Sequence, residues 1–290
     1  MLADAIRAEG YRLSKNRTAL FWSVVFVPIV AVAIGALTSV FLKGSETKLL
    51  GDSKTPPEVQ QMLASTPLNL GEAIVSSAAD LANPLILLFV LIGAATIYAG
   101  DYRWESWRLI SARNSRTNLL LGKLVVVAGL SLIAMVLMLV AGLIETLIRA
   151  AVFDRPLTFS VTGAMLGQFL GQFALSWLRI VQFTMVGMLA AVVTRSLLAA
   201  LFVPLVVGVA QFFSPNMLMP MGVMPDAWVA MLINPGAAVD TVSALITGGA
   251  EAAALPDGLP LKAWISLALW VFVPLAGSIT WFKRQDLSKE

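Results

Sequence analysis

Four polar side chains stand out within a long apolar stretch, residues 159–194. Arg179 is the only charged residue there, and Gln172, Ser176 and Gln182 flank it. Residues 172, 176 and 179 follow helical spacing, so they share one face of a helix. An arginine inside a membrane span is costly and typical of a substrate path, but its long side chain can also extend to the outer surface. We therefore predict either a polar cavity lined by these residues or an arginine that reaches the headgroups.

A second candidate for the substrate path is Glu145. It lies near the end of the apolar run 124–148, and Arg149 follows four residues later, where a helix brings the two together. The pair can serve as a polar contact for a substrate or as a partly solvated ion pair at the headgroup level. Its terminal position favours the second interpretation.

Several classes of chemistry are excluded by composition. The chain has no cysteine and no histidine, so it lacks thiolate and imidazole as nucleophile, general base or metal ligand. It also lacks the nucleotide-binding, nucleophile-elbow and zinc-protease motifs. We expect no catalytic residue, no metal, no bound cofactor and no enzymatic activity.

Composition sets the fold class. Hydrophobic residues make up 58% of the 290 residues, charged residues only 13%, and the mean hydropathy is +0.84. About 20 apolar residues span a bilayer as a helix. Six such runs are present, at 18–42, 81–99, 124–148, 175–194, 197–213 and 263–282, and residues 159–174 are expected to approach the fourth along the outer interface. The sequence predicts an all-α, polytopic membrane protein with six transmembrane helices in one domain, 1–290.

The charges predict its orientation. Basic residues concentrate in 1–17, in 101–123, at Arg195 and after 282, whereas acidic residues concentrate in 43–80 and 214–262. By the positive-inside rule, both termini are cytoplasmic. Segment 43–80 is then an external loop, with a possible short helix after Pro57. Segment 214–262 is external or re-entrant, because its apolar part can enter the interface without crossing.

Two cytoplasmic segments are amphipathic. Segment 1–17 can lie in the headgroup plane as an interfacial helix or act only as a basic flank. Segment 101–120 places Trp104 and Trp107 three residues apart, so a helix presents both on one side. That side can anchor in a partner's groove or in the aromatic belt of the membrane. Its candidate partner-binding residues are Tyr102, Arg103, Trp104, Glu105, Trp107, Arg108 and Arg113.

This layout resembles the permease subunit of type 2 ABC transporters. The matching stretches are RAEGYRLSKNRTALFW at 7–22, ESWRLISARNSRTNLLLGKL at 105–124 and WFKRQDL at 281–287. The resemblance implies that two permeases pair in the membrane above two separate ATPase subunits, which bind the ATP. It also implies that 1–17 is an elbow helix, that a coupling helix within 102–112 docks on the ATPase, and that a short helix pair lies between spans five and six.

The function expected from the resemblance is an ATP-driven exporter of a bacterial plasma membrane, which moves an amphipathic peptide, lipid or drug-like compound. Its partners would be the ATPase subunits, a second permease and membrane lipid, with no nucleic acid. The alternatives are an ion-coupled secondary transporter, a permease that serves a metal-enzyme maturation system, and a polytopic membrane enzyme. A secondary transporter typically has an internal repeat and ionisable groups at the midplane, and neither is evident in the sequence.

Overall fold

The computed structural model describes residues 2–51, 67–103, 107 and 114–285. Within them, six helices are long and apolar enough to cross a membrane. They cover Arg17–Gly44, Pro84–Arg103, Arg116–Val152, Gly163–Thr194, Leu197–Met221 and Leu259–Arg284. This confirms the predicted all-α class and the six spans of a multi-pass membrane protein.

The elements follow one another along the chain with short connections. The first part contains α1 (Leu2–Lys15), α2 (Arg17–Leu20), a π-helical turn (Phe21–Val25) and α3 (Phe26–Gly51). The middle part contains β1 (Leu68–Asn69), α5 (Leu70–Ala79), a 3-10 turn (Asp80–Ala82), α6 (Pro84–Arg103), α8 (Arg116–Val152), β2 (Leu157–Thr158) and α9 (Gly163–Thr194). The last part contains α10 (Leu197–Leu218), a 3-10 turn (Met219–Met221), α11 (Trp228–Ile233), α12 (Pro235–Thr247), α13 (Gly249–Ala253) and α14 (Leu259–Arg284).

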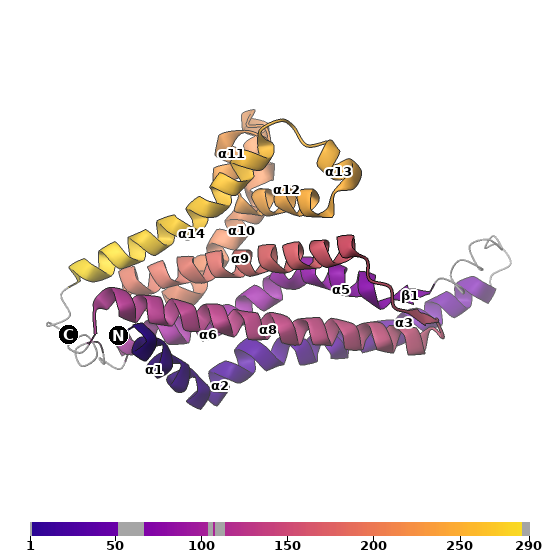
Figure 1. Cartoon of the computed structure of the whole chain (residues 1–290), viewed down its shortest axis with the longest axis horizontal. Coiled ribbons are helices and arrows are strands. Elements are labelled where there is room, and N and C mark those ends of the chain that lie inside the picture. The colour runs from indigo at the N-terminus through magenta and orange to yellow at the C-terminus, as the bar shows by residue number, and fades with distance from the viewer. Residues whose placement is uncertain (1, 52–66, 104–106, 108–113, 286–290) are drawn as a thin grey trace.

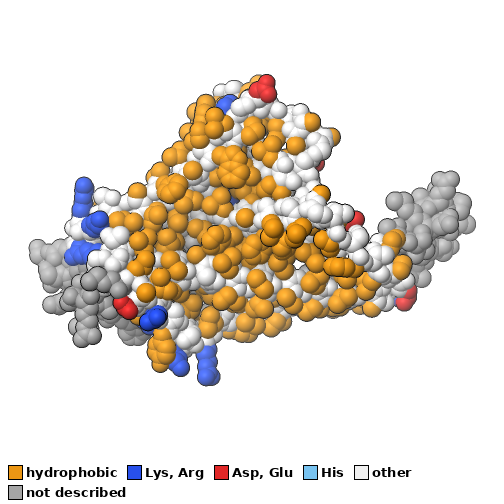
Figure 2. All heavy atoms as spheres, viewed as in Figure 1, with side chains coloured by type: hydrophobic (Ala, Val, Ile, Leu, Met, Phe, Trp, Pro, Cys, Tyr) orange, Lys and Arg blue, Asp and Glu red, His pale blue; other side chains and the backbone are white. Residues whose placement is uncertain are grey.

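Helices α6 and α9 form the centre of the bundle. Both are mostly buried, whereas α3, α10 and α14 expose much of their apolar surface. Phe41 on α3 and Phe212 on α10 are 83% and 76% exposed, and apolar side chains cover most of the face seen in Figure 2. Such a surface is stable only against lipid or another apolar partner. The outer helices therefore carry the faces that meet the membrane.

Both ends of the chain lie at the same end of the bundle (Figure 1). Most of the Lys and Arg side chains visible in Figure 2 gather at this end, which we call the terminal end. The C-terminal ends of α6, α9 and α14 and the N-terminal end of α8 meet there (Figure 1). The arrangement agrees with an even number of spans. The cytoplasmic location of this end stays a prediction.

Two regions differ from the sequence-based expectation. Part of the predicted external loop 43–80 is helix: α3 continues to Gly51, and α5 packs against α8 and α9. The approach to the fourth span is not a separate interfacial segment, because α9 runs without interruption from Gly163 to Thr194. The Thr162 side chain caps this helix at the backbone N–H of Met165, and no proline interrupts it. The possible helix after Pro57 falls outside the described residues.

Between spans five and six, the segment 214–262 folds into short helices. Helix α12 packs against α9 and α14, with Ala238 and Val242 buried at the contact. Helix α11 precedes it, and Asn234 joins the two by accepting hydrogen bonds from the first backbone N–H groups of α12. In Figure 1 these short helices lie at the ends of α10 and α14 farthest from the termini.

Candidate functional site

A buried ion network joins three helices at the terminal end. The Lys123 ammonium on α8 lies 2.6 Å from an Asp101 carboxylate oxygen on α6 and 2.9 Å from Glu9 on α1. It also donates to the Ile97 carbonyl at 2.8 Å. Arg12 on α1 bridges the same two carboxylates at 2.8 Å and 3.1 Å. The Lys123 and Asp101 side chains are fully buried, so these charges interact where solvent screens them little.

The network requires α1 to approach α8 closely. Gly122, next to Lys123, makes this possible, because a Cβ atom added there would lie 2.8 Å from the Cβ of Ala5. Ala5 and Glu9 are four residues apart on α1, so both face α8, and both are buried. Helix α1 is therefore packed onto the bundle by Ala5 and Glu9, and its more exposed Arg12 reaches the same network.

Trp107 lies beside this network, inside the protein. Its side chain is fully buried, with its ring centre 4.5 Å from that of Phe282 on α14 and 5.4 Å from that of Tyr102 on α6. The Lys123 ammonium is 5.3 Å from the centre of the Trp107 ring, within the range of a cation–π interaction. Within the described part of the chain, its indole N–H has no acceptor.

The end of α14 is held at the same place by hydrogen bonds. Arg116 at the start of α8 donates to the carbonyl oxygens of Phe282, Lys283 and Gln285 at 3.1, 3.1 and 2.6 Å. The Tyr102 hydroxyl donates to the Gln285 side-chain oxygen at 3.0 Å. The Gln285 amide in turn donates to the Val192 carbonyl near the end of α9. Helices α1, α6, α8, α9 and α14 are thus connected around Trp107.

The predicted partner-binding residues divide into three groups. Tyr102 and Trp107 are buried within this chain, and Arg103 is exposed at the end of α6. Trp104, Glu105, Arg108 and Arg113 lie outside the described residues. Trp107 was expected to place its ring in a partner's groove or in the aromatic belt of the membrane, whereas the structure packs that ring between Tyr102 and Phe282. The coupling role of the segment stays a prediction.

Arg179 lies near the middle of the 32-residue α9 and lines a cavity. The cavity measures about 670 Å³ and lies between α6, α9, α10 and α12. The guanidinium donates to the side-chain oxygens of Gln211 on α10 at 2.5 Å and of Gln182 at 3.3 Å, and it lies 4.5 Å from the centre of the Phe183 ring. Asp240 of α12 lines the same cavity, and burial raises the pKa of its carboxyl group while nearby Arg179 opposes that shift.

The other predicted path residues of α9 hold helices together. Gln172 donates to the hydroxyl of Ser243 on α12 at 2.8 Å, and the Ser176 hydroxyl donates to the carbonyl of Ala78 on α5 at 2.9 Å. The Gln182 amide donates to the carbonyl of Leu267 on α14 at 2.9 Å. Of the four residues, the structure brings Arg179 and Gln182 together. Gln172 and Ser176 are instead occupied by contacts to neighbouring helices.

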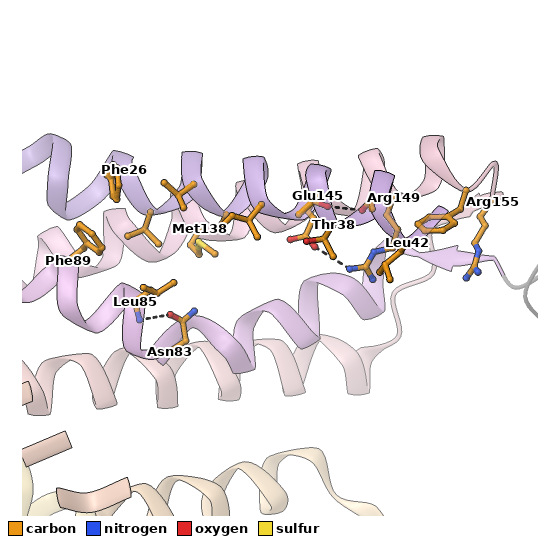
Figure 3. A pocket seen from close by; sticks show the side chains of 17 residues that line it. Phe26, Thr38, Leu42, Asn83, Leu85, Phe89, Met138, Glu145, Arg149 and Arg155 are labelled. Atoms are coloured by element: carbon orange, nitrogen blue, oxygen red, sulfur yellow. Dashed lines mark hydrogen bonds and ion pairs between the residues drawn. The ribbon is translucent and has the colours of Figure 1, made fainter. Parts of the chain in front are cut away.

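Glu145 lines a second cavity, of about 590 Å³, between α3, α6 and α8. Its carboxylate lies 3.2 Å from the Arg149 guanidinium, and both side chains are partly exposed. Gly35 of α3 allows Glu145 to pack against that helix, since an added Cβ would lie 2.6 Å from the carboxylate carbon. In Figure 3 the polar groups Glu145, Arg149 and Arg155 gather at one end of this cavity. The ion pair that was expected there is formed.

Sequence reasoning missed the partners that complete both sites. Asp101 lies just after the second apolar run, and Lys123 directly precedes the third. Two opposite charges placed in this way, at the end of one span and the start of the next, are the signal that could have found the pair. Gln211 is an amide in the middle of an apolar run, which is unusual enough to notice. Among the described residues, no group of three or more Asp, Glu, His or Cys side chains could hold a metal ion.

The chain matches no protein-family model, no curated protein and no solved structure. The likeness to type 2 ABC permeases therefore stays a resemblance carried by the three short stretches quoted above.

Proposed function

We propose that this chain is the membrane-spanning subunit of an ATP-driven exporter in a bacterial plasma membrane, with both termini cytoplasmic. It would pair with a second permease and bind two separate ATPase subunits that hold the ATP. Segment 1–17 would serve as the elbow helix and segment 101–120 as the coupling segment. The cargo would be an amphipathic compound.

The observation that supports this proposal is the packing of Trp107. This residue belongs to the proposed coupling segment, yet its ring is enclosed by α6 and α14 and touches the network that holds α1 to α8. Movement of the segment would therefore act on four helices at once. Packed interfaces of this kind transmit displacement because a close-packed core deforms little.

The proposal is tested by co-purification. The tagged chain is expressed together with the ATPase encoded by a neighbouring reading frame, and the amount of ATPase retained in detergent is measured. We expect stable association and ATP hydrolysis that changes when the chain is present. If the ATPase is not retained in detergent, the proposed ATP-driven mechanism is contradicted.

A pair of charge reversals locates the contact. Arg103→Glu changes an exposed residue at the start of the coupling segment, and Arg284→Glu changes an exposed residue at the end of α14, at the same end of the bundle. We expect only Arg103→Glu to reduce ATPase association, with insertion and stability unchanged for both variants. Equal loss in both would indicate a general effect of charge rather than docking by this segment.

An ion-coupled secondary transporter is the second candidate. Arg179 and Asp240 line the same cavity, and ionisable groups inside a membrane domain are typical of ion-coupled transport. Proteoliposomes containing only this chain distinguish the two functions. Transport driven by an imposed proton or sodium gradient would favour the carrier, whereas transport that requires the ATPase and ATP favours the exporter.

A further inference from the structure

The cavity at Arg179 combines a cationic group with apolar walls. Its lining includes Leu87 and Leu91 of α6, Phe183 of α9, and Leu205, Val209 and Phe212 of α10. Its volume of about 670 Å³ lies within the range of sites that bind small organic molecules. A cavity with this lining suits a ligand that is mostly apolar and carries one polar group.

The charge of that polar group follows from the partners of Arg179. Its guanidinium donates to two amide oxygens, those of Gln182 and Gln211, which accept hydrogen bonds but carry no negative charge. Among the ion pairs formed by the described residues, none includes Arg179. Arg179 is partly buried, and its hydrogen-bond partners are neutral. Because desolvation destabilises such a cation, an anion brought close to it would recover electrostatic energy.

Two further groups shape the field at this point. Gly236, at the start of α12, lies beside Arg179, since a Cβ added to it would be 3.7 Å from the guanidinium. The N-terminal end of a helix carries a partial positive charge and so adds to that of the arginine. Asp240 lines the same cavity, and its carboxylate interacts electrostatically with Arg179. A ligand anion at Arg179 would therefore compete with Asp240.

The cavity also reaches the surface that faces lipid. Val209, Phe212 and Phe213 line it and are 57%, 76% and 51% exposed. These residues belong to α10, one of the apolar outer helices. A hydrocarbon chain extending from the cavity would continue along this face without leaving an apolar environment.

We propose that this cavity binds an anionic amphiphile from the membrane, with its phosphate or carboxylate head at Arg179 and Gln211 and its hydrocarbon chain against α10. That this ligand is the cargo rests on the proposed exporter function. The binding itself does not require the ATPase. A failure to bind the ATPase and a failure to bind the amphiphile are therefore separate results.

The test is lipid retention by the purified full-length chain. Native mass spectrometry in detergent compares bound phosphatidylglycerol with bound phosphatidylcholine of the same acyl chains. We expect a preference of about tenfold for the anionic lipid. This factor corresponds to about 1.4 kcal/mol, which is the contribution expected from one charge-assisted hydrogen bond. Arg179→Gln should remove the preference, and Arg179→Lys should retain part of it. The matched control Arg195→Gln changes an exposed arginine just after α9 and should leave the preference intact.

Asp240→Asn is expected to change lipid retention in the direction opposite to the arginine variants. Its result therefore does not depend on whether those variants fold. Because it removes the competing carboxylate, it should strengthen retention of phosphatidylglycerol. Weaker retention of phosphatidylglycerol by this variant, or a preference of the parent chain for phosphatidylcholine, would mean that the cavity does not select an anionic head and would overturn the proposal. Equal retention of both lipids by the parent chain, or equal loss in Arg195→Gln, would overturn it as well. Displacement of the bound lipid by millimolar glycerol phosphate would show that the cavity binds a small soluble anion rather than an amphiphile, and it would also overturn the proposal.

Discussion

Lys123 and Arg179 are both cations within spanning helices, and the protein surrounds them in opposite ways. Lys123 lies between two carboxylates and a backbone carbonyl, and it is fully buried at the terminal end of the bundle. Arg179 lies in the middle of α9 with two neutral amides and an aromatic ring, beside a cavity of about 670 Å³. One charge is compensated within the chain, and the other has no ion-pair partner among the described residues.

The difference separates a charge that holds helices together from a charge that can bind a ligand. A buried cation with two anionic partners fixes the geometry of the helices that supply them, because removal of any member leaves the others uncompensated. A partly buried cation whose hydrogen-bond partners are neutral stabilises the fold less and can gain energy from an external anion. We therefore expect substitutions at the Lys123 network to change stability and substitutions at Arg179 to change binding.

The largest expected effect is that of Lys123→Met. This change leaves the buried carboxylates of Asp101 and Glu9 with Arg12 as the one remaining cation of the network, and we expect the free energy of unfolding to fall by about 3–5 kcal/mol. Unfolding of the purified chain in detergent, followed by circular dichroism, measures it. Lys43→Met, which breaks an exposed ion pair with Asp154, is the matched control and should cost less than about 1 kcal/mol.

The double variant Asp101→Asn, Lys123→Met sharpens this result. It removes one charge of each sign and keeps the pair of Glu9 and Arg12, so it should lose less stability than the sum of the two single variants. Additive losses would show that the two side chains do not interact in the folded protein.

Trp107→Ala should have the next largest effect on stability. It empties the space between Tyr102 and Phe282, and truncation of a large buried aromatic side chain costs about 3 kcal/mol or more. Trp107→Phe is the control, because it keeps an aromatic ring and removes an indole N–H that has no acceptor in the described part of the chain. Thermal unfolding of both variants in detergent provides the comparison. Similar losses in the two would argue that the N–H group, rather than the packing, is what matters.

The two sites also differ in how far the sequence could predict them. Arg179 was predictable as a polar residue of a span, and so was its neighbour Gln182 one turn later, because both lie on one helix. Gln211 and Asp240 were not, since helical periodicity does not say which other helix faces a given residue. The Lys123 network joins residues 9, 101 and 123, whose pairing depends on the close approach of α1 to α8 at Gly122.

The fold shows the same division between local and tertiary information. The six spans follow from the length of the apolar runs, and the placement of both termini at one end follows from their even number. Helix α5 was not predicted, because ten residues rich in alanine and serine resemble a loop until α8 and α9 are there to bury them. For the same reason the sequence did not predict the burial of Trp107, since its neighbour Phe282 lies 175 residues away in the sequence.

Arg179→Gln should have a much smaller effect on stability than Lys123→Met. The new amide can still form hydrogen bonds with Gln182 or Gln211, and the desolvated charge is removed, so we expect a change within about 1 kcal/mol. The same detergent unfolding assay measures it beside the Lys123 variant. A loss as large as that of Lys123→Met would indicate that Arg179 forms a strong ion pair in solution, for which Asp240 is the nearest candidate, and the contrast between the two cations would disappear.

Glu145→Gln should have the smallest effect. Glu145 and Arg149 form a partly exposed ion pair four residues apart on one helix, a kind of pair that contributes about 0.3–0.5 kcal/mol. Gln keeps the length of the side chain, so its packing against Gly35 and the shape of the second cavity should be preserved. Unfolding at low and high salt checks this, because screening should remove the difference between the variant and the parent. A difference that persists at high salt, or exceeds 1 kcal/mol, would place Glu145 with Lys123 as a buried, compensated charge.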